Sequence, residues 1–296
     1  MSRALALIDD RIVEEKDATV FWNDPGFRRG YGVFETILVA NGRAFLAGLH
    51  ALRLTDGAPK LGIDPWMHPR TLVRRLRRLI RDSGTVEGVA RVFLTPGPAP
   101  AGEAPGIPEI TGAVPGAQTH RARYVATITT RHLPPPFVRA IIAPSLRDAA
   151  GPLVGIKTLS YAEEQLLLTR AQAAGADEAL RRNLQGRITE GTGSNVFLIN
   201  GRSLITPPIS EGILPGITRW FVLRTAPDDG YEPREEPVTV ETLFGAEEAF
   251  ITSTTRGIVP LVSVDGRPIG TGEPGPKASR LAAILDRHVR RGKDIP

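Results

Sequence analysis

One lysine of the sequence stands where a reactive amine would be useful. Lys157 follows Gly155 and Ile156 and precedes an expected helix that begins near Tyr161. Apolar surroundings disfavour the ammonium form of lysine and favour the neutral amine, which is the form that attacks a carbonyl carbon. A lysine at the start of a helix more often extends its amine into solvent. The position by itself therefore leaves both interpretations open.

Four other segments carry groups that could bind a ring or an anion. Glu190 precedes a glycine- and hydroxyl-rich stretch, and glycines let a backbone approach a ligand closely. An expected helix start near Pro215 leaves backbone N–H groups for an anion, and residues 252–257 (TSTTRG) offer four hydroxyls. Arg53 lies in a helical apolar pattern, and a guanidinium suits phosphate. Taken singly, these segments also fit a hairpin turn, a capped helix, a polar turn and a salt-bridged arginine.

The combination is more informative than its members. A lysine, a carboxylate, an arginine and two hydroxyl-rich turns are the groups that hold pyridoxal phosphate, at its aldehyde, its ring nitrogen and its phosphate. His50, close to Arg53, is interpreted as a packed or capping residue instead of a catalyst.

Clusters of Pro and Gly indicate how the chain is divided. Residues 95–118 are predicted to form a long surface loop, and residues 131–136, which include three consecutive prolines, an interdomain linker. We expect a small N-terminal α/β domain over residues 1–130 and a larger domain over residues 137–296 that carries Lys157. Short strands with fewer helices favour the α+β class.

Hydrophobic periodicity and turn residues locate the expected elements. Asn41-Gly42 is a strong hairpin signal between two strand-like runs. Residues 27–29 are treated as part of a strand. The expected strands cover residues 31–40, 43–46, 89–94, 138–143, 176–180, 187–188, 194–199, 203–205 and 248–252. The expected helices cover residues 46–54, 69–82, 161–175, 215–222, 238–244 and 277–289.

Composition excludes several classes of protein. The formal net charge of +5 comes from 32 arginines and 5 lysines against 32 acids, and the arginines are spread along the chain. A basic nucleic-acid-binding protein is therefore disfavoured, and the run at residues 74–78 (RRLRR) is interpreted as the exposed face of a helix. The lack of cysteine excludes disulfides and thiolate ligands, and no metal site is predicted. No apolar run has the length of a membrane span or a signal sequence, so we expect a cytoplasmic protein without membrane partners.

The sequence resembles the fold-type IV, or class IV, pyridoxal-phosphate aminotransferases over most of its length. This family includes D-amino-acid aminotransferases, branched-chain aminotransferases, (R)-amine transaminases and aminodeoxychorismate lyases. The order and spacing of five blocks carry the resemblance: GYGVFETILVANGRAFLAGLHALRL, KTLSYAEEQLLLTRAQAAGADEAL, GRITEGTGSNVFLI, GILPGITR and ITSTTRGIVPL.

The resemblance implies a role for each matched residue. Lys157 would form the Schiff base with the cofactor, Glu190 would pair with the ring nitrogen, and Tyr161 would bond the phenolic oxygen. Leu214 would lie against the ring, and Asn195 would support the site. The phosphate would be held by Arg53, Ile217, Thr218 and Thr254. The resemblance also implies a β-barrel-like sheet in the larger domain, and a homodimer whose active sites lie at the subunit interface.

The substrate is the point at which the sequence departs from the family patterns. The R-G-x-x-x-R-x-H motif of D-amino-acid enzymes is missing after residue 94, and Val89 stands where branched-chain enzymes have tyrosine. Strand alternation would direct Arg29 to the same side as Phe27, and Arg29 with Arg91 could clamp a carboxylate from two strands. Arg28 is an alternative, either arginine could instead be exposed, and Thr255 is a further candidate substrate residue.

These features favour a transaminase that acts on D-amino acids and 2-oxo acids such as pyruvate or 2-oxoglutarate, with some (R)-amine activity. An aminodeoxychorismate lyase is the leading alternative, and a branched-chain L-amino-acid aminotransferase is the third.

Overall fold

The computed structural model describes residues 3–98 and 121–292, which form two compact units. Unit 1 contains Met1–Arg131, Ile156–Tyr161 and Gly292–Pro296, and unit 2 contains His132–Gly155 and Ala162–Arg291. The segment that carries Lys157, expected in the larger domain, thus belongs to unit 1. Most of the predicted loop, residues 99–118, lies outside the described residues.

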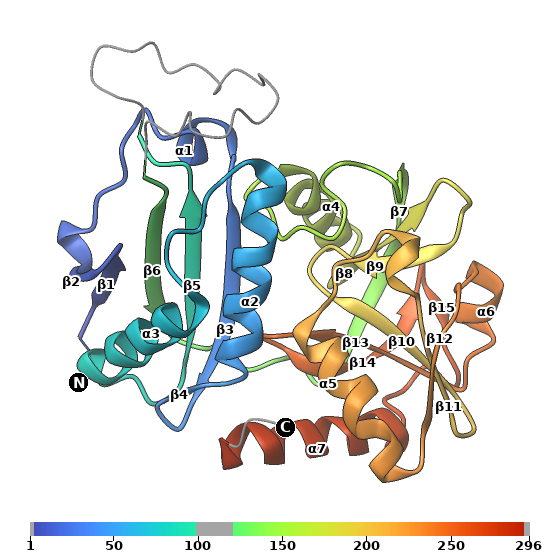
Figure 1. Cartoon of the computed structure of the whole chain (residues 1–296). Helices are drawn as coiled ribbons and strands as arrows, with labels where there is room; N and C mark the ends of the chain where they lie inside the picture. The colour runs from blue at the N-terminus through green and yellow to red at the C-terminus, as the bar shows by residue number, and fades with distance from the viewer. Residues whose placement is uncertain (1–2, 99–120, 293–296) are drawn as a thin grey trace. The chain divides into compact units, whose positions relative to one another are not determined.

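Unit 1 is built on a six-stranded antiparallel sheet (Figure 1). The helices α2 (Ala47–Gly57) and α3 (Pro69–Ser83) cover one face of this sheet. The shorter helices are η1 (Glu15–Asp17), α1 (Pro25–Arg29) and η2 (Ala58–Leu61). In spatial order the strands are β2 (Arg11–Glu14), β1 (Leu5–Ile8), β6 (Arg123–Thr129), β5 (Gly88–Thr95), β3 (Val33–Ala40) and β4 (Arg43–Ala44).

The hairpin between β3 and β4 confirms the Asn-Gly prediction. Asn41 has φ 50° and Gly42 has φ 69°, so both central residues are left-handed. This conformation matches the right-handed twist of paired strands and requires residues that tolerate positive φ. The turn sets the register of Ala40 opposite Arg43.

Unit 2 contains a closed ring of six strands, which confirms the predicted barrel-like sheet. The ring closes because β9 (Ile188–Gly191) pairs with both β8 (Glu178–Asn183) and β10 (Asn195–Asn200). From β10 it continues through β13 (Glu248–Ser253), β14 (Gly257–Val264) and β7 (Val138–Arg147) back to β8. Three further strands extend the sheet: β11 (Ser203–Thr206), β12 (Glu232–Glu235) and β15 (Arg267–Pro268).

The helices of unit 2 lie close to their expected positions. The four α-helices are α4 (Ala162–Ala173), α5 (Ile217–Thr225), α6 (Val240–Phe244) and α7 (Pro276–Arg291), and the 3-10 helices are η3 (Ile209–Glu211) and η4 (Ala226–Asp229). The mixed content and the segregation of strands and helices agree with the predicted α+β class.

The expectation of a strand at residues 27–29 is wrong. These residues belong to α1 because Pro25 stands at the first turn, Asp24 caps it by accepting from Gly26 N at 2.7 Å, and Gly30 ends it with φ 64°. Successive residues of a helix turn by about 100°, so side chains two apart point in different directions. Strand alternation therefore does not place Phe27 and Arg29 on one side.

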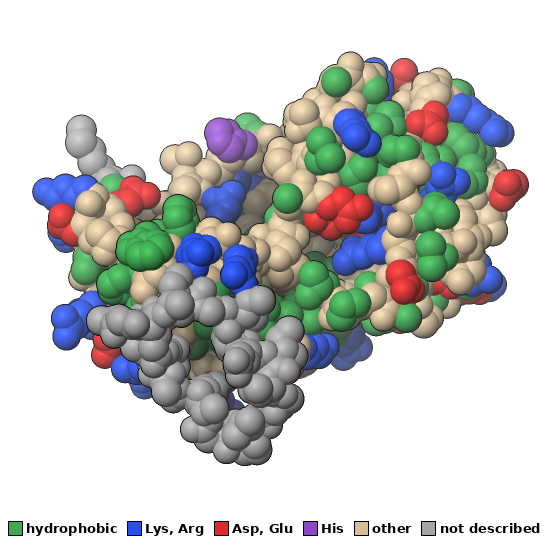
Figure 2. All heavy atoms as spheres, turned by 90° about the horizontal axis from the view of Figure 1, so that it is seen from above, with side chains coloured by type: hydrophobic (Ala, Val, Ile, Leu, Met, Phe, Trp, Pro, Cys, Tyr) green, Lys and Arg blue, Asp and Glu red, His purple; other side chains and the backbone are tan. Residues whose placement is uncertain are grey.

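Charge on the surface is mixed. On the face in Figure 2, blue and red side chains are interspersed among the described residues instead of forming a broad basic patch. Arg74, Arg77 and Arg78 of α3 are exposed, as predicted, and Arg78 Nε lies 3.3 Å from Asp82 Oδ2. Within residues 3–98 and 121–292, no helix has the length and apolar character needed to span a membrane.

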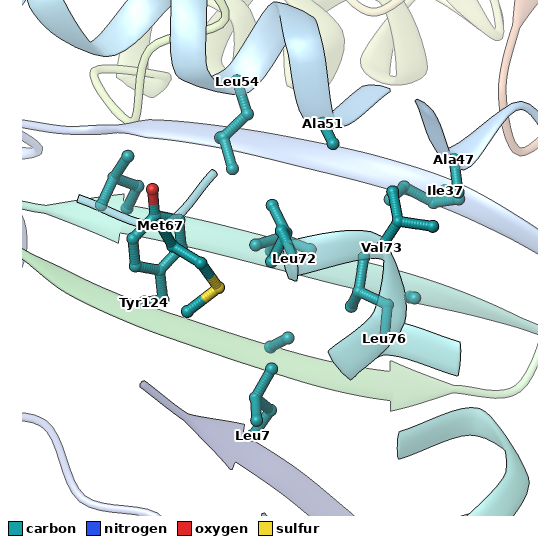
Figure 3. Close-up of a cluster of buried hydrophobic side chains, with 14 of the residues drawn as sticks. Leu7, Ile37, Ala47, Ala51, Leu54, Met67, Leu72, Val73, Leu76 and Tyr124 are labelled. Carbon is teal, nitrogen blue, oxygen red and sulfur yellow. The ribbon is translucent and has the colours of Figure 1, made fainter. Parts of the chain in front are cut away.

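The core of unit 1 lies between the sheet and its two helices (Figure 3). Leu7, Ile37 and Tyr124 come from β1, β3 and β6, and their side chains meet those of Leu54 in α2 and Leu76 in α3. Buried residues of α3 recur at helical spacing, so one face of this helix is apolar while the other carries its arginines. This packing fixes α2, and with it the residues that α2 presents to β3.

Replacement of Leu76 tests this core. Leu76 has no exposed surface, so Leu76→Ala should lower the free energy of unfolding by about 2–5 kcal/mol, through lost burial and a cavity. Arg77→Ala, at the exposed neighbouring position, should change it by less than about 0.5 kcal/mol. Urea denaturation of both variants gives the two values, and equal effects would contradict the assignment of this core.

Candidate active site

The segment Ile156–Tyr161 runs beside β3 in unit 1. Phe34 N donates to Lys157 O at 2.9 Å, and Thr158 forms a bridge with Val33. The half-buried Lys157 Nζ lies 4.4 Å from the centre of the Phe34 ring and 5.7 Å from that of Tyr161. The fold thus brings the predicted lysine and tyrosine together. An amine over aromatic rings gains cation–π attraction while it is charged.

A buried charge cluster joins β3 to α2. Glu35 accepts from Arg53 Nε at 2.6 Å and from Arg53 Nη2 at 2.8 Å, a two-point contact that fixes the guanidinium. His50 Nδ1 lies 2.7 Å from the same carboxylate. His50 and Glu35 are each only 1% exposed, so His50 is a packed residue, as expected.

The three groups set one another's charge. Burial raises the pKa of the Glu35 carboxyl, but the charges and hydrogen bonds of Arg53 and His50 outweigh burial and hold the pKa at about 2. Burial lowers the pKa of His50 from its usual value despite the nearby carboxylate. The ring is therefore neutral near pH 7, and Arg53 is the cation that balances Glu35.

In unit 2, Glu190 lies at the end of β9 among several donors. Its Oε2 accepts from Leu214 N at 2.9 Å and from Asn195 Nδ2 at 3.4 Å, and its Oε1 from Arg147 Nη1 at 3.2 Å. Asn195 Nδ2 also donates to Leu214 O at 3.0 Å. The structure thus places three predicted residues together and adds Arg147, whose guanidinium pairs with the Glu190 carboxylate.

The amino end of α5 adjoins these residues. Gly216 is its N-cap, and a Cβ there would collide with Asn195 Oδ1, so this close approach requires glycine. Ile217 and Thr218 are the first two residues of the helix, and their N–H groups belong to the turn that an α-helix leaves without internal partners. Such an end favours an anion.

The predicted hydroxyl-rich turn joins β13 to β14. Thr254 and Thr255 are half-buried there, and Thr252, the residue opposite Asn195 in the β10–β13 pair, is 1% exposed. Within the described residues, Thr252 Oγ1 is buried without a hydrogen-bond partner. A buried hydroxyl is costly without a partner, so a ligand that supplies one is favoured here.

The candidate substrate residues are placed unequally in unit 1. Arg91 of β5 lies opposite Thr36 of β3. The next pair but one is Phe34 with Phe93, and because side chains two residues apart on a strand point to the same side, Arg91 shares the sheet face of Phe34. Its Nη1 donates to Thr129 Oγ1 at 2.8 Å. Phe27, Arg28 and Arg29 are exposed on α1. A clamp from two strands by Arg29 and Arg91 is therefore wrong.

Several charged residues of these clusters escaped the sequence reasoning. Two of them, Glu35 and Glu178, are buried carboxylates. The other two, Arg147 and Arg256, are arginines that pair with a buried carboxylate. The available signal was an acid inside a strand-like apolar run, as at Glu35 and Glu178, because such a residue needs a partner once it is buried.

Glu35→Gln tests the charge cluster. The wild-type carboxyl, with its pKa lowered to about 2, contributes roughly 3 kcal/mol of stability that is complete above pH ~4.5 and is lost as the pH falls toward 2. At pH 7 the variant should lose about 3–5 kcal/mol, because Arg53 and His50 lose a buried partner. This deficit should shrink between pH 4.5 and 2.

Unfolding by urea across this pH range measures the deficit. Glu15→Gln, at an exposed acid of the same unit, serves as the control and should show little difference at any pH. A deficit in Glu35→Gln that stays constant with pH would contradict the assigned charge states.

Known proteins share both the sequence pattern and the fold. A family model described as amino-transferase class IV matches residues 32–264. The D-alanine aminotransferase of Bacillus licheniformis is 30% identical over 289 residues, which cover 96% of each chain. A putative branched-chain-amino-acid aminotransferase of Methanocaldococcus jannaschii is 34% identical, over 93% of this chain and 92% of that one.

Solved structures give the same result. A branched-chain aminotransferase from Thermoproteus uzoniensis, solved with norvaline, has TM-score 0.86 and 29% identity, over 99% of this chain and 96% of that chain. A putative 4-amino-4-deoxychorismate lyase from Legionella pneumophila has TM-score 0.81 and 28% identity, over 93% of this chain and 97% of that chain. From its family match and its relatives, this chain is a member of the class IV aminotransferases.

Proposed function

We propose that the protein transfers an amino group between a D-amino acid and a 2-oxo acid such as pyruvate or 2-oxoglutarate, with some activity on (R)-amines. The supporting observation is the placement of Arg91 on the sheet face of Phe34, over whose ring the Lys157 amine lies. An amine and a carboxylate-binding cation on one face suit an amino acid. The enzyme is an aminotransferase, and the cofactor of its family is pyridoxal 5′-phosphate.

Groups in each unit fit this cofactor. In unit 2, the amino end of α5 and the unpartnered hydroxyl of Thr252 suit a phosphate, and Glu190, which pairs with Arg147, suits a protonated ring nitrogen. In unit 1, the Lys157 amine suits an aldehyde. We assign the phosphate to Arg53, Ile217, Thr218 and Thr254, the phenolic oxygen to Tyr161, the ring face to Leu214 and the orientation of Glu190 to Asn195.

When bound, pyridoxal phosphate supplies a ring that accepts the electron pair left as the Cα–H bond of the amino acid breaks. Lys157 would hold the cofactor's aldehyde, and once the amino acid has taken its place the Nζ amine would accept the Cα proton. The Glu190 carboxylate keeps a proton on the ring nitrogen. The two halves of the reaction follow one another, so ping-pong kinetics are expected.

Arg91 orients the substrate in this proposal by binding its α-carboxylate with a guanidinium. Phe27, Arg29 and Thr255 stay predicted substrate residues, with Arg29 now on α1. A D preference means that the Cα hydrogen of the D-enantiomer, and not that of the L-enantiomer, faces the Lys157 amine once Arg91 holds the carboxylate.

Two other activities have specific support. The Legionella structure, a putative 4-amino-4-deoxychorismate lyase, favours a lyase that releases pyruvate without a 2-oxo acid acceptor. The relative in Methanocaldococcus jannaschii favours transfer from branched-chain L-amino acids. A nucleic-acid-binding role has no comparable support: the arginines are spread along the chain, and basic and acidic side chains are interspersed on the face that Figure 2 shows.

The proposed assembly is a homodimer in the cytoplasm. Four large apolar side chains of one short segment of unit 1 are exposed, and such a patch favours contact with another protein surface. They are Val20 at 61%, Phe21 at 45%, Trp22 at 70% and Phe27 at 68%. A second copy of the chain is the partner we propose.

Lys157→Ala tests the cofactor assignment. Addition of pyridoxal phosphate to the wild type should give a yellow absorption band, and borohydride should then fix the cofactor on the peptide that contains Lys157. Lys157→Ala should show neither the yellow band nor the fixed cofactor, because it lacks the amine that binds the aldehyde. Lys60→Ala, at an exposed lysine of unit 1, should behave as the wild type. A colourless wild-type protein would refute the proposed function.

The amino-acid half-reaction tests the stereochemistry. D-alanine and D-glutamate should abolish the yellow band, and L-alanine, L-glutamate and L-leucine should leave it unchanged. Arg91→Gln should raise the concentration of D-amino acid needed by roughly 10- to 100-fold, since a charge-assisted contact is lost. Arg74→Gln, on the exposed face of α3, is the control. Reaction with L-enantiomers alone would overturn the D assignment.

A further inference from the structure

Glu178 is a buried carboxylate that none of the proposed reaction steps uses. It is the first residue of β8 and has no exposed surface. A carboxylate in this position must be matched by a cation and by hydrogen-bond donors, because it has lost its water. Its surroundings therefore show which segments it holds together.

One turn binds Glu178 through backbone and hydroxyl donors. Residues 191–194 connect the end of β9 to β10. Thr192 N donates to Oε1 at 3.0 Å, the Thr192 hydroxyl donates to the same oxygen, and Ser194 Oγ donates to Oε2 at 2.9 Å. A Cβ at Gly191 would collide with Ser194 Oγ and come within 2.9 Å of Glu178 Cδ. The turn is thus closed tightly around the carboxylate.

The second turn supplies the cation. Residues 254–256, between β13 and β14, end in Arg256, whose Nη2 donates to Glu178 Oε2 at 2.5 Å. Ser194 and Arg256 therefore meet at a single carboxylate oxygen. The two turns are neighbours because β10 begins where β13 ends, with Asn195 opposite Thr252.

The same end of β10 and β13 carries the features that fit an anion. Thr252 Oγ1 is the buried hydroxyl without a described partner, and Asn195 adjoins Gly216 at the start of α5. The ion pair of Glu178 with Arg256 thus joins the turn that precedes Asn195 to the turn that follows β13, the strand of Thr252. Neither ionised group needs to contact a ligand to fix where the hydroxyls and amides of the turns lie.

We propose that Glu178, through its ion pair with Arg256, is the positioning residue for the phosphate-binding part of the site. It holds residues 191–194 and 254–256 in one arrangement, so their donors are set before the phosphate arrives. Preorganised donors bind an anion more tightly than donors that must be ordered on binding. This inference rests on the proposed function.

Binding to the apo-protein tests the role without catalysis. The probes are pyridoxal 5′-phosphate, inorganic phosphate and pyridoxal, which lacks the phosphate. In Glu178→Gln and in Arg256→Gln, the Kd for both phosphate-bearing probes should rise roughly 10- to 100-fold, as expected when contacts to a charged group are weakened. The Kd for pyridoxal should stay within about 2-fold of the wild type, because the aldehyde and ring contacts remain.

Further variants separate positioning from general destabilisation. Arg256→Lys keeps the charge and should recover part of the phosphate affinity lost in Arg256→Gln. If Glu178→Gln fails to fold, these two variants of Arg256 still test the ion pair. The double variant should bind phosphate no more weakly than either single variant, since both remove one interaction. Asp229→Asn breaks the ion pair with Arg280 elsewhere in unit 2 and should leave all three probes unchanged.

Three results would overturn the inference. Equal weakening for pyridoxal and its phosphate would show a merely structural role. Tighter phosphate binding in Glu178→Gln with loss in Arg256→Gln would show that Arg256 binds the phosphate directly. Unchanged phosphate affinity in both variants would show that the ion pair has no such role. Failure of the wild type to bind pyridoxal phosphate would instead refute the proposed function.

Discussion

A carboxylate that leaves water must be matched by a cation, and this constraint organises the candidate site residues of both units. Each of three buried or nearly buried acids has one arginine partner: Glu35 with Arg53, Glu190 with Arg147 and Glu178 with Arg256. In each pair the acid and the arginine come from different elements. The electrostatic requirement therefore joins segments that the chain alone does not bring together.

These pairs act on the proposed chemistry in different ways. In unit 1, Glu35 fixes the guanidinium of Arg53 at the interface of α2 and β3, and backbone bonds from β3 hold the segment of Lys157. In unit 2, Arg147 pairs with Glu190, and the Glu178–Arg256 pair joins two turns. The Lys157 amine is thus placed by backbone pairing, whereas the proposed anion and ring contacts depend on buried charge.

Segments with a strong hydrophobic periodicity or a specific turn sequence were predicted well from sequence. The hairpin at Asn41-Gly42 and the apolar face of α3 follow from local rules, and both were found. Other elements were missed because their formation depends on distant partners. Strand β14 contains Pro260, which lacks an N–H, yet it forms because β13 and β7 flank it. The strand expected at residues 27–29 is instead part of α1, because Asp24 and Gly30 cap a helix there.

The sequence by itself determined the family and predicted the lysine and the residue types expected at the cofactor, because these depend on the order and spacing of short blocks. Only the tertiary structure decided which charges are paired and that the segment of Lys157 belongs to unit 1. It also decided that Arg91 shares a sheet face with Phe34, whereas Arg29 lies on a helix. Pairing, burial and sheet register join residues far apart in the chain, and local sequence patterns do not encode those contacts.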